Sequence, residues 1–170
     1  MPGEYCWSSP YLQPKLYVEG LETVDGYALV KDDVIECSDA CPSGAECLAK
    51  RIYGSELDSI VDLVAKKAVR RFAVLLPDGR SIMVEKGATL EPIPLNGFRI
   101  HLEVCEGDEV DNEDVIGYVL TGKGETRTIR SHVKGLVAYI YASPQGPPDE
   151  YIVFIAPSGE GGVRLGRHRC

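Results

Sequence analysis

Residues 117–130, G-Y-V-L-T-G-K-G-E-T-R-T-I-R, admit two interpretations, and the choice between them decides the fold of the second half of the chain. The stretch begins like a phosphate-binding loop, but Gly124 stands where such a loop needs Ser or Thr to hold magnesium. A phosphate-binding loop also leads into a helix, whereas residues 126–130 are β-branched and alternate in polarity like a strand. We therefore interpret the stretch as a β-hairpin with Lys123 at its tip.

Further strands surround this hairpin. Residues 98–104, F-R-I-H-L-E-V, alternate strictly between apolar and polar side chains, as in a strand with one buried face. Short apolar runs between Gly, Asp and Pro turns predict more strands at 115–121, 125–130, 135–142 and 151–156. This pattern is typical of a small β-sandwich or barrel.

The first half of the chain has a mixed pattern. Strands are expected at 16–20, 27–37, 72–76 and 80–86, the last two joined by a Pro-Asp-Gly turn. A capping box, Ser43-x-x-Glu46, predicts a short helix over 43–53. A second helix is expected over 55–71, because its apolar residues have helical spacing: Leu57, Ile60, Val61, Val64 and Ala68.

The predicted fold class is therefore α+β. We expect a mixed α/β region with two helices over residues 1–87, a β domain over 88–157 and a tail over 158–170.

Composition and charge exclude several classes of function. The 170 residues are 44% hydrophobic and carry a net charge of -8, which argues against nucleic acid as a partner. The basic cluster at 66–71 is explained as the positive end of the second helix. The longest apolar run, residues 136–142, is too short to cross a membrane, and the first residues do not resemble a signal peptide. We expect a cytoplasmic protein without a membrane partner.

Two segments resemble the biotinyl and lipoyl carrier domains. They are residues 104–110, V-C-E-G-D-E-V, and residues 120–140, L-T-G-K-G-E-T-R-T-I-R-S-H-V-K-G-L-V-A-Y-I. The resemblance covers roughly residues 90–157 and implies a barrel-sandwich hybrid, with Lys123 as the attachment site for biotin or lipoate. The tip departs from those families, since it is Gly-Lys-Gly where biotinyl domains have Met-Lys-Met and lipoyl domains Asp-Lys-Ala. The hairpin is also one residue longer.

The whole chain resembles an uncharacterised archaeal family of unknown function, in which a single-hybrid-motif domain follows an extra N-terminal region. Asn and Gln are scarce, a composition associated with thermophilic proteins. Disulfides occur inside the cells of hyperthermophiles, so the six cysteines have a possible structural role even in the cytoplasm.

Three of these cysteines form a dense cluster, Cys37-x3-Cys41-x5-Cys47. A zinc site needs four ligands, so these three residues form a metal site only if another Cys or a His completes it. The structural alternatives are buried free thiols or a disulfide such as Cys37–Cys47.

No group of residues in the sequence forms a recognisable nucleophile, acid–base pair or metal catalyst. The histidines, His101, His132 and His168, are expected at the surface. We therefore expect a non-enzymatic protein that acts as a binding or assembly module for a protein partner or for its own copy. Two alternatives stay open: a carrier with biotin or lipoate on Lys123, and a metal or redox protein that uses Cys37, Cys41 and Cys47.

Overall fold

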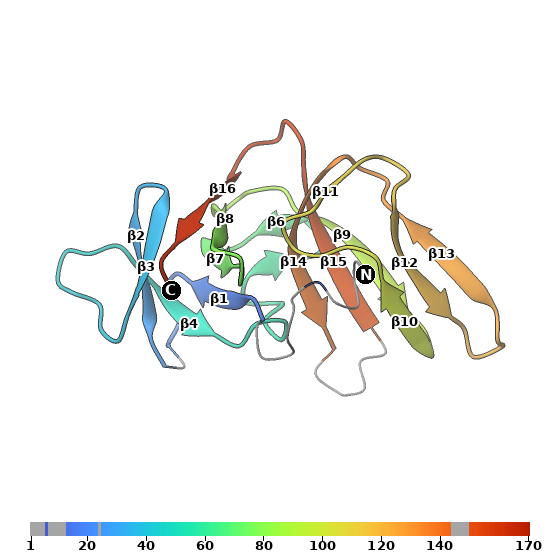
Figure 1. The fold of residues 1–170 in the computed structure, drawn as a ribbon, viewed down its shortest axis with the longest axis horizontal. Helices are drawn as coiled ribbons and strands as arrows, with labels where there is room; N and C mark the ends of the chain where they lie inside the picture. The colour runs from blue at the N-terminus through green and yellow to red at the C-terminus, as the bar shows by residue number, and fades with distance from the viewer. Residues whose placement is uncertain (1–5, 7–12, 24, 144–149) are drawn as a thin grey trace.

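A computed structural model describes residues 6, 13–23, 25–143 and 150–170, and the chain there consists of strands and turns (Figure 1). No helix occurs in these residues, so the fold is all-β and the expected α+β class is wrong. Parts of the predicted regions, residues 1–5, 7–12, 24 and 144–149, lie outside the described residues.

Seven strands close into a small barrel at one end of the molecule, in the order β1-β4-β2-β3-β16-β8-β7. The barrel strands are β1 (Lys15–Val18), β2 (Tyr27–Lys31), β3 (Val34–Ser38), β4 (Cys47–Arg51), β7 (Phe72–Leu75), β8 (Arg80–Val84) and β16 (Val163–His168). The expected hairpin of 72–76 with 80–86 is confirmed as β7 and β8. The expected strand over 27–37 is instead the hairpin β2–β3, which turns at Asp32, where φ is 54°.

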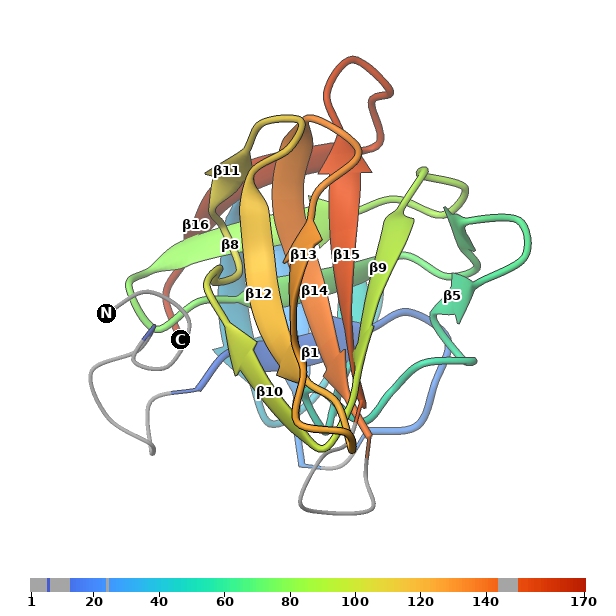
Figure 2. The ribbon, with the colours of Figure 1, turned by 90° about the vertical axis from the view of Figure 1, so that its right-hand side faces the viewer.

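Two further sheets continue the molecule away from the barrel, one in front of the other in Figure 2. The four-stranded sheet, in the order β11-β14-β15-β9, contains β9 (Glu91–Asn96), β11 (Glu109–Val110), β14 (Gly135–Ala142) and β15 (Glu150–Pro157). The three-stranded sheet, in the order β10-β12-β13, contains β10 (Arg99–Leu102), β12 (Val115–Leu120) and β13 (Thr126–Arg130). The strands predicted in this half are confirmed, and β9 is an addition to them.

Three apolar cores follow one another along the long axis. The first fills the barrel and includes Leu48 and Leu75. The second joins the barrel to the four-stranded sheet, with Phe72 on the barrel side and Phe154 on the sheet side. The third, which includes Val153, lies between the four-stranded and three-stranded sheets. The four-stranded sheet is thus the shared middle layer, and both of its faces are covered.

This position explains the sequences of β14 and β15, G-L-V-A-Y-I-Y-A and E-Y-I-V-F-I-A-P. A strand with one wet face alternates between apolar and polar residues, whereas a strand covered on both faces is apolar almost throughout. Phe154 points into the second core and its neighbours Val153 and Ile155 into the third. The two strands pair over most of their length, with a bulge between Val137 and Tyr139.

A polar contact also ties the first half of the chain to the middle sheet. The hydroxyl of Tyr53 donates to the carboxylate of Glu106 and accepts from the backbone N–H of Ile140 at 3.2 Å. The Tyr139 hydroxyl donates to the Glu56 carbonyl at 2.7 Å, and the rings of Tyr53 and Tyr139 meet edge to face. Burial, followed by the nearby charge of Glu106, raises the pKa of Tyr53 well above its ordinary value.

The expected helix over 43–53 is wrong. Residues 47–51 form β4, which pairs with both β1 and β2, and the preceding loop is closed by the Cys41–Cys47 disulfide. The Glu46 carboxylate does not complete a capping box, because it forms an ion pair with Arg71. Tertiary pairing therefore overrides a local helix signal.

The expected helix over 55–71 is also wrong. A single helical turn forms, with Val61 N–H bonded to the Leu57 carbonyl at 2.9 Å. The Asp62 side chain then accepts from the N–H groups of Val64 and Ala65 and turns the chain into the two-residue pair β5 (Val61–Asp62) and β6 (Lys67–Ala68). Val64, which a helix would place on the buried face, is 95% exposed.

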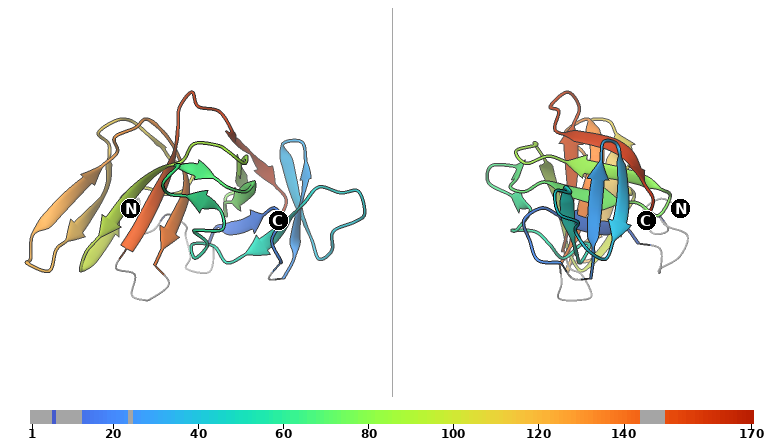
Figure 3. Two further views of the ribbon diagram at one scale, coloured as in Figure 1. Left: turned by 180° about the vertical axis from the view of Figure 1, so that it is seen from behind. Right: turned by 90° about the vertical axis from the view of Figure 1, so that its left-hand side faces the viewer.

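The segment 158–170, expected to be a tail, contributes β16 to the barrel. β16 pairs antiparallel with β8 over five residues and parallel with β3 over two. Figure 3 shows it running beside β8 toward the β2–β3 hairpin, at the opposite end from β13. The division of the rest of the chain at residues 87 and 88 stays a prediction. No helix in the described part of the chain is long and apolar enough to cross a membrane.

Candidate functional site

Lys123 lies at the tip of the hairpin that joins β12 to β13. The turn is closed by two backbone hydrogen bonds, from Thr121 N–H to the Glu125 carbonyl at 2.8 Å and from Gly124 N–H to the Thr121 carbonyl at 3.0 Å. Gly124 has a φ of 82°, a conformation that glycine adopts without strain. Lys123 is exposed, and in the described part of the chain no ion pair includes it. The hairpin interpretation is confirmed, and the modification of Lys123 stays a prediction.

An exposed aromatic side chain lies near the root of this hairpin. Phe98, in the turn between β9 and β10, is 71% exposed, and its N–H donates to the Leu120 carbonyl at 2.8 Å. Gly97 fits closely against β12, since a Cβ built there would lie 2.2 Å from Val119 Cγ1. The turn is therefore held against the end of β12 while its aromatic ring faces solvent.

β13 forms an edge of the three-stranded sheet and lies at the far end of the molecule (Figure 1). Four of its five residues are exposed, the exception being the half-buried Ile129. In an antiparallel ladder, hydrogen-bonded residue pairs alternate with pairs that are not hydrogen-bonded. Thr121 and Glu125 form a hydrogen-bonded pair, so on β13 the next residue bonded to β12 is Arg127. Thr126 and Thr128 therefore direct their backbone N–H and C=O groups away from β12.

The segment around β13 is basic in an otherwise acidic protein. Residues 121–134 hold four cationic side chains, those of Lys123, Arg127, Arg130 and Lys134, and one acidic side chain, that of Glu125. The Arg130 guanidinium donates to the carbonyl of Glu113, in the turn before β12, at 3.0 Å.

The turn after β13 is anchored to β9 through Glu91. Its carboxylate lies 2.8 Å from His132 Nε2 and 2.9 Å from Lys66 Nζ. Burial alone would raise the pKa of Glu91, but the hydrogen bonds from His132 and Lys66 outweigh it, and the pKa is lowered. His132 thus has a structural partner at the surface.

The other two histidines are partly buried, and each has a partner. His101 on β10 stacks on Tyr118 with ring centroids 6.4 Å apart, and its Nε2 lies 3.1 Å from the Glu103 carboxylate. The ring of His168 is 2.6 Å from the Leu76 carbonyl. In the described chain none of the three approaches a Ser or Cys in a nucleophile arrangement.

A groove of about 760 Å³ lies beside β11, β14 and the residues after β15. Its lining includes Glu109, Asp111 and Lys134, and the last two form an ion pair at 3.8 Å. The charges of this pair cancel, and Glu109 is the one further charged residue of the lining, so the groove has no cluster of like charges.

The six cysteines form three disulfides: Cys6–Cys105, Cys37–Cys170 and Cys41–Cys47. The disulfide suggested from the sequence, Cys37–Cys47, is wrong, because each of these cysteines is bonded to another partner. Cys37, Cys41 and Cys47, the candidate metal ligands, offer no thiolate in this oxidised state. Among the described residues no group of three or more Cys, His, Asp or Glu side chains is arranged to hold a metal ion.

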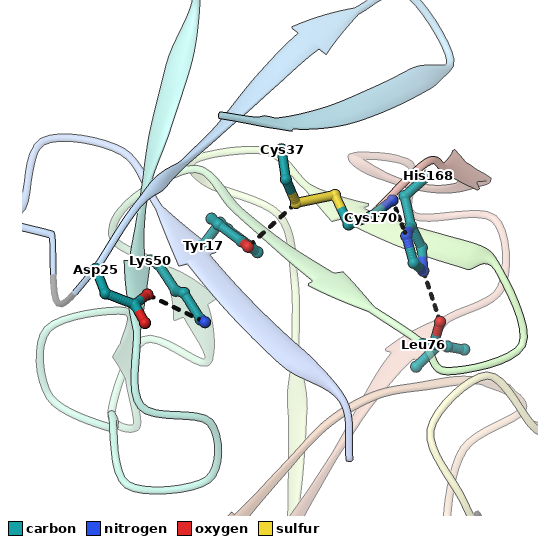
Figure 4. The surroundings of a disulfide bond; sticks show 7 residues. All are labelled: Tyr17, Asp25, Cys37, Lys50, Leu76, His168 and Cys170. Atoms are coloured by element: carbon teal, nitrogen blue, oxygen red, sulfur yellow. Dashed lines mark hydrogen bonds and ion pairs between the residues drawn. A yellow bond between two sulfur atoms is a disulfide. The ribbon is translucent and has the colours of Figure 1, made fainter. Parts of the chain in front are cut away.

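The Cys37–Cys170 disulfide lies beside a cavity of about 380 Å³ at the barrel surface. Figure 4 shows that Tyr17 from β1 points at Cys37, with its hydroxyl 3.2 Å from the sulfur, while Lys50 and Asp25 form an ion pair at 3.1 Å nearby. His168 Nδ1 accepts from the Cys170 N–H at 3.1 Å.

Sequence reasoning found Lys123 but missed two features of these sites. The exposure of Phe98 could not be read from a strand whose other apolar residues point inward. The Cys37–Cys170 pair spans 133 residues, and no local pattern connects them. One local signal pointed to this site: Tyr17 lies in an apolar strand, and a buried tyrosine hydroxyl needs a hydrogen-bond partner.

Comparison with known proteins gives a family but no activity. Residues 11–158 match the family described as "Uncharacterized protein conserved in archaea (DUF2118)". A search of curated proteins finds no match. Because the family match covers most of the chain, the chain belongs to this uncharacterised archaeal family, DUF2118.

Proposed function

We propose that the chain is a non-catalytic binding module, and that an acidic, extended segment of a partner protein docks along the free edge of β13. In this mode a peptide adds a strand to an exposed sheet edge, with backbone hydrogen bonds supplying affinity and side chains supplying selectivity. The observation that carries the proposal is the outer edge of β13, with which no strand of the described residues pairs.

A contrast between two sheet edges supports this proposal. β9 is an edge strand of the four-stranded sheet, and it carries Pro92 and Pro94. Prolines on an edge strand occupy positions whose N–H would face solvent, so they remove the donors that a docking strand needs. β13 has no proline, and Thr126 and Thr128 turn their backbone groups outward.

β10, the other edge of the three-stranded sheet, is less accessible than β13. β10 has one exposed residue, Arg99, followed by three half-buried ones. β13 is exposed at all positions except Ile129. A partner strand therefore meets less obstruction at β13.

Charge selects the kind of partner. Arg127 and Arg130 lie on β13, and Lys123 lies in the turn before it. Basic side chains along a strand favour opposite charges directly across from them and disfavour like charges. The rest of the chain is strongly acidic, so a second copy would present mostly like charge unless it used its own basic segment.

Binding of a short synthetic peptide of alternating Glu and Val, measured by fluorescence anisotropy, tests the proposal. The peptide should bind the intact protein, and the same peptide with Lys in place of Glu should not. Thr128→Pro should weaken binding about tenfold by removing an outward N–H, while Thr128→Val keeps that N–H and should bind like the parent.

Equal affinity for both peptides, or no effect of Thr128→Pro, would contradict docking on this edge. Sedimentation equilibrium tests whether a second copy of the chain occupies the edge instead. A stable dimer of the parent that is lost in Thr128→Pro would assign the edge to a second copy.

A second candidate function is a carrier with biotin or lipoate on Lys123. Its support is the exposed lysine on a tight hairpin, together with the resemblance of residues 104–110 and 120–140 to biotinyl and lipoyl carriers. We rank it second because Gly122 and Gly124 flank the lysine where those carriers have other residues. A carrier would gain mass in its own cells, and the gain would vanish in Lys123→Arg; the unadorned mass would exclude it.

The third candidate is a metal or redox protein that uses Cys37, Cys41 and Cys47. Metal binding would require the reduced chain, since these sulfurs are in disulfides here. We propose the cytoplasm as the compartment of this protein; its three disulfides are compatible with that compartment in a hyperthermophile.

A further inference from the structure

The Cys37–Cys170 disulfide differs from the other two disulfides in position. It links β3 to the residues that follow β16, and both of its cysteines are exposed. The seam that it spans is short, since β16 and β3 are in register only at Val34 and Ile35. Two further backbone bonds continue the seam, from Arg167 N–H to the Asp33 carbonyl at 3.0 Å and from Arg169 N–H to the Ile35 carbonyl at 2.8 Å.

The Tyr17 hydroxyl is a hydrogen-bond donor to one of the two sulfurs. It lies 3.2 Å from Cys37 Sγ, and a disulfide sulfur has no proton of its own, so the hydroxyl donates. Tyr17 is 3% exposed, and burial, with a smaller contribution from the charge of Asp25, raises its pKa above the ordinary value. The hydroxyl therefore keeps its proton at neutral pH.

A donor at this position makes the two sulfurs unequal. When a disulfide breaks, the leaving sulfur takes the electron pair, and a hydrogen bond to the resulting thiolate lowers its pKa and favours its departure. Cys37 is the sulfur that has this donor. An incoming thiolate is therefore expected to attack Cys170 and to expel Cys37.

The surroundings of the other disulfides are different. Carbonyl oxygens of Pro42 and Ala45 lie 3.8 and 3.9 Å from Cys41 Sγ, and the Ala45 carbonyl is also 3.8 Å from Cys47 Sγ. An oxygen lone pair near a sulfur opposes negative charge on it. In the third disulfide Cys105 is buried, with 9% exposure, so an attacking thiol has little access.

The cavity of about 380 Å³ supplies access to Cys37 and Cys170. Its lining holds two cationic side chains, Lys15 and Lys50, and two acidic ones, Asp25 and Asp39. Lys50 is paired with Asp25 at 3.1 Å, so the cavity gives a thiol access to the two sulfurs without a net charge that would repel its thiolate. Figure 4 shows Lys50 and Tyr17 on the same side of the disulfide.

From these contacts we propose that Cys37–Cys170 is a thiol–disulfide exchange site that accepts two electrons from a dithiol, with Tyr17 as the donor to the leaving sulfur. This activity is separate from docking on β13 and does not depend on it.

The proposed reaction has two steps. One thiolate of the dithiol attacks Cys170 Sγ, the Cys37–Cys170 bond breaks, and the electron pair goes to Cys37 Sγ beside the Tyr17 hydroxyl. The second thiol of the dithiol then attacks the first sulfur of the same dithiol, which is bonded to Cys170 in the mixed disulfide, and Cys170 leaves. The dithiol ends as a disulfide, and its two protons and two electrons end on Cys37 and Cys170.

Reduction of the oxidised full chain by dithiothreitol at neutral pH tests the proposal. Quenching by alkylation and peptide mass spectrometry follow each disulfide separately. Cys37–Cys170 should open about tenfold or more faster than Cys41–Cys47, which is also near the surface. Tyr17→Phe should slow the opening of Cys37–Cys170 about three- to tenfold, the range of one hydrogen bond, and leave Cys41–Cys47 unchanged.

The side of attack gives an independent readout. With a monothiol such as glutathione, which cannot complete the second step alone, the mixed disulfide should form on Cys170. Equal or faster opening of Cys41–Cys47, an unchanged rate in a folded Tyr17→Phe protein, or the adduct on Cys37 would each overturn the proposal. A cooperative thermal transition verifies that the variant folds.

Discussion

The two sheets of the second half differ in how much of each is covered. The four-stranded sheet is packed on the barrel through one face and on the three-stranded sheet through the other, and the prolines of β9 protect one of its edges. The three-stranded sheet has one covered face, one solvent face and an open edge at β13. Stability should therefore depend on the middle layer, whereas binding should depend on the outer one.

This contrast follows from the order of the three layers. A residue in the middle layer is fixed by neighbours on both sides, so changes there are costly. A residue on the outer face of β13 contacts solvent, and its backbone groups are available to another chain.

The largest effect is expected from Phe154→Ala in the middle layer. Phe154 has no exposed surface and lies in the core shared with the barrel, so the change should lower the free energy of unfolding by about 3–5 kcal/mol. Phe98→Ala is the matched control, because Phe98 is 71% exposed and its loss should change stability by less than about 0.5 kcal/mol. Similar losses in urea unfolding of both variants would remove the distinction between the layers.

Gly135→Ala should have the next largest effect. Gly135 begins β14, and an added Cβ would lie 2.1 Å from the carbonyl oxygen of Ala156 on β15, a clash that only backbone movement relieves. We expect a loss of about 1–3 kcal/mol in urea unfolding. Gly122→Ala in the outer hairpin, where nothing lies within 4 Å of the added Cβ, should be nearly neutral. A neutral Gly135→Ala would mean that the β14–β15 contact is looser than described.

Tyr53→Phe should cost about 1–3 kcal/mol at neutral pH, because it leaves the Glu106 carboxylate without this donor. The raised pKa of Tyr53 means that the unfolded chain loses this proton first as pH rises. The stabilisation is therefore complete below about pH 10, the ordinary tyrosine pKa, and is lost above it.

Above about pH 10, the free energy of unfolding should therefore fall less steeply with pH in Tyr53→Phe than in the parent. The two slopes should differ by up to about 1.4 kcal/mol per pH unit. Tyr118→Phe, on the solvent face of the outer sheet, is the control for loss of a tyrosine hydroxyl and should leave stability at neutral pH within about 0.5 kcal/mol of the parent. An unchanged slope in Tyr53→Phe would argue against the buried pair.

The smallest effect on stability is expected from Arg127→Ala with Arg130→Ala on β13. Both side chains are exposed, so the free energy of unfolding should change by no more than about 0.5 kcal/mol each. The affinity for the Glu-Val peptide should nevertheless fall, and its dependence on salt should weaken, because the two changes remove positive charge beside the docked peptide, one charge on each face of β13. Unchanged affinity and salt dependence would show that charge does not select the partner.

The parts of the fold that were predictable have local causes. The β12–β13 hairpin was found because strand alternation and the turn around Gly124 are contained in one short stretch. β9 was missed because Pro92 and Pro94 usually end a strand, although an edge strand accommodates them.

The wrong predictions arose where distant contacts outweigh local patterns. The segment with Ile60, Val61 and Val64 has helical spacing, yet the Asp62 side chain turns the chain and Val64 faces solvent. β16 depends on strands far away in the sequence, and half of its residues are exposed while the other half are only partly buried, so no apolar pattern indicates it. The Cys37–Cys170 pair lacked a local signal for the same reason.

Residue-resolved hydrogen exchange with and without the Glu-Val peptide tests directly whether β13 is the docking edge. We expect the peptide to slow exchange at the outward amides of Thr126 and Thr128, while β14 and β15 are protected in both samples. Protection gained elsewhere, or no change at these two amides when the peptide is bound, would contradict it.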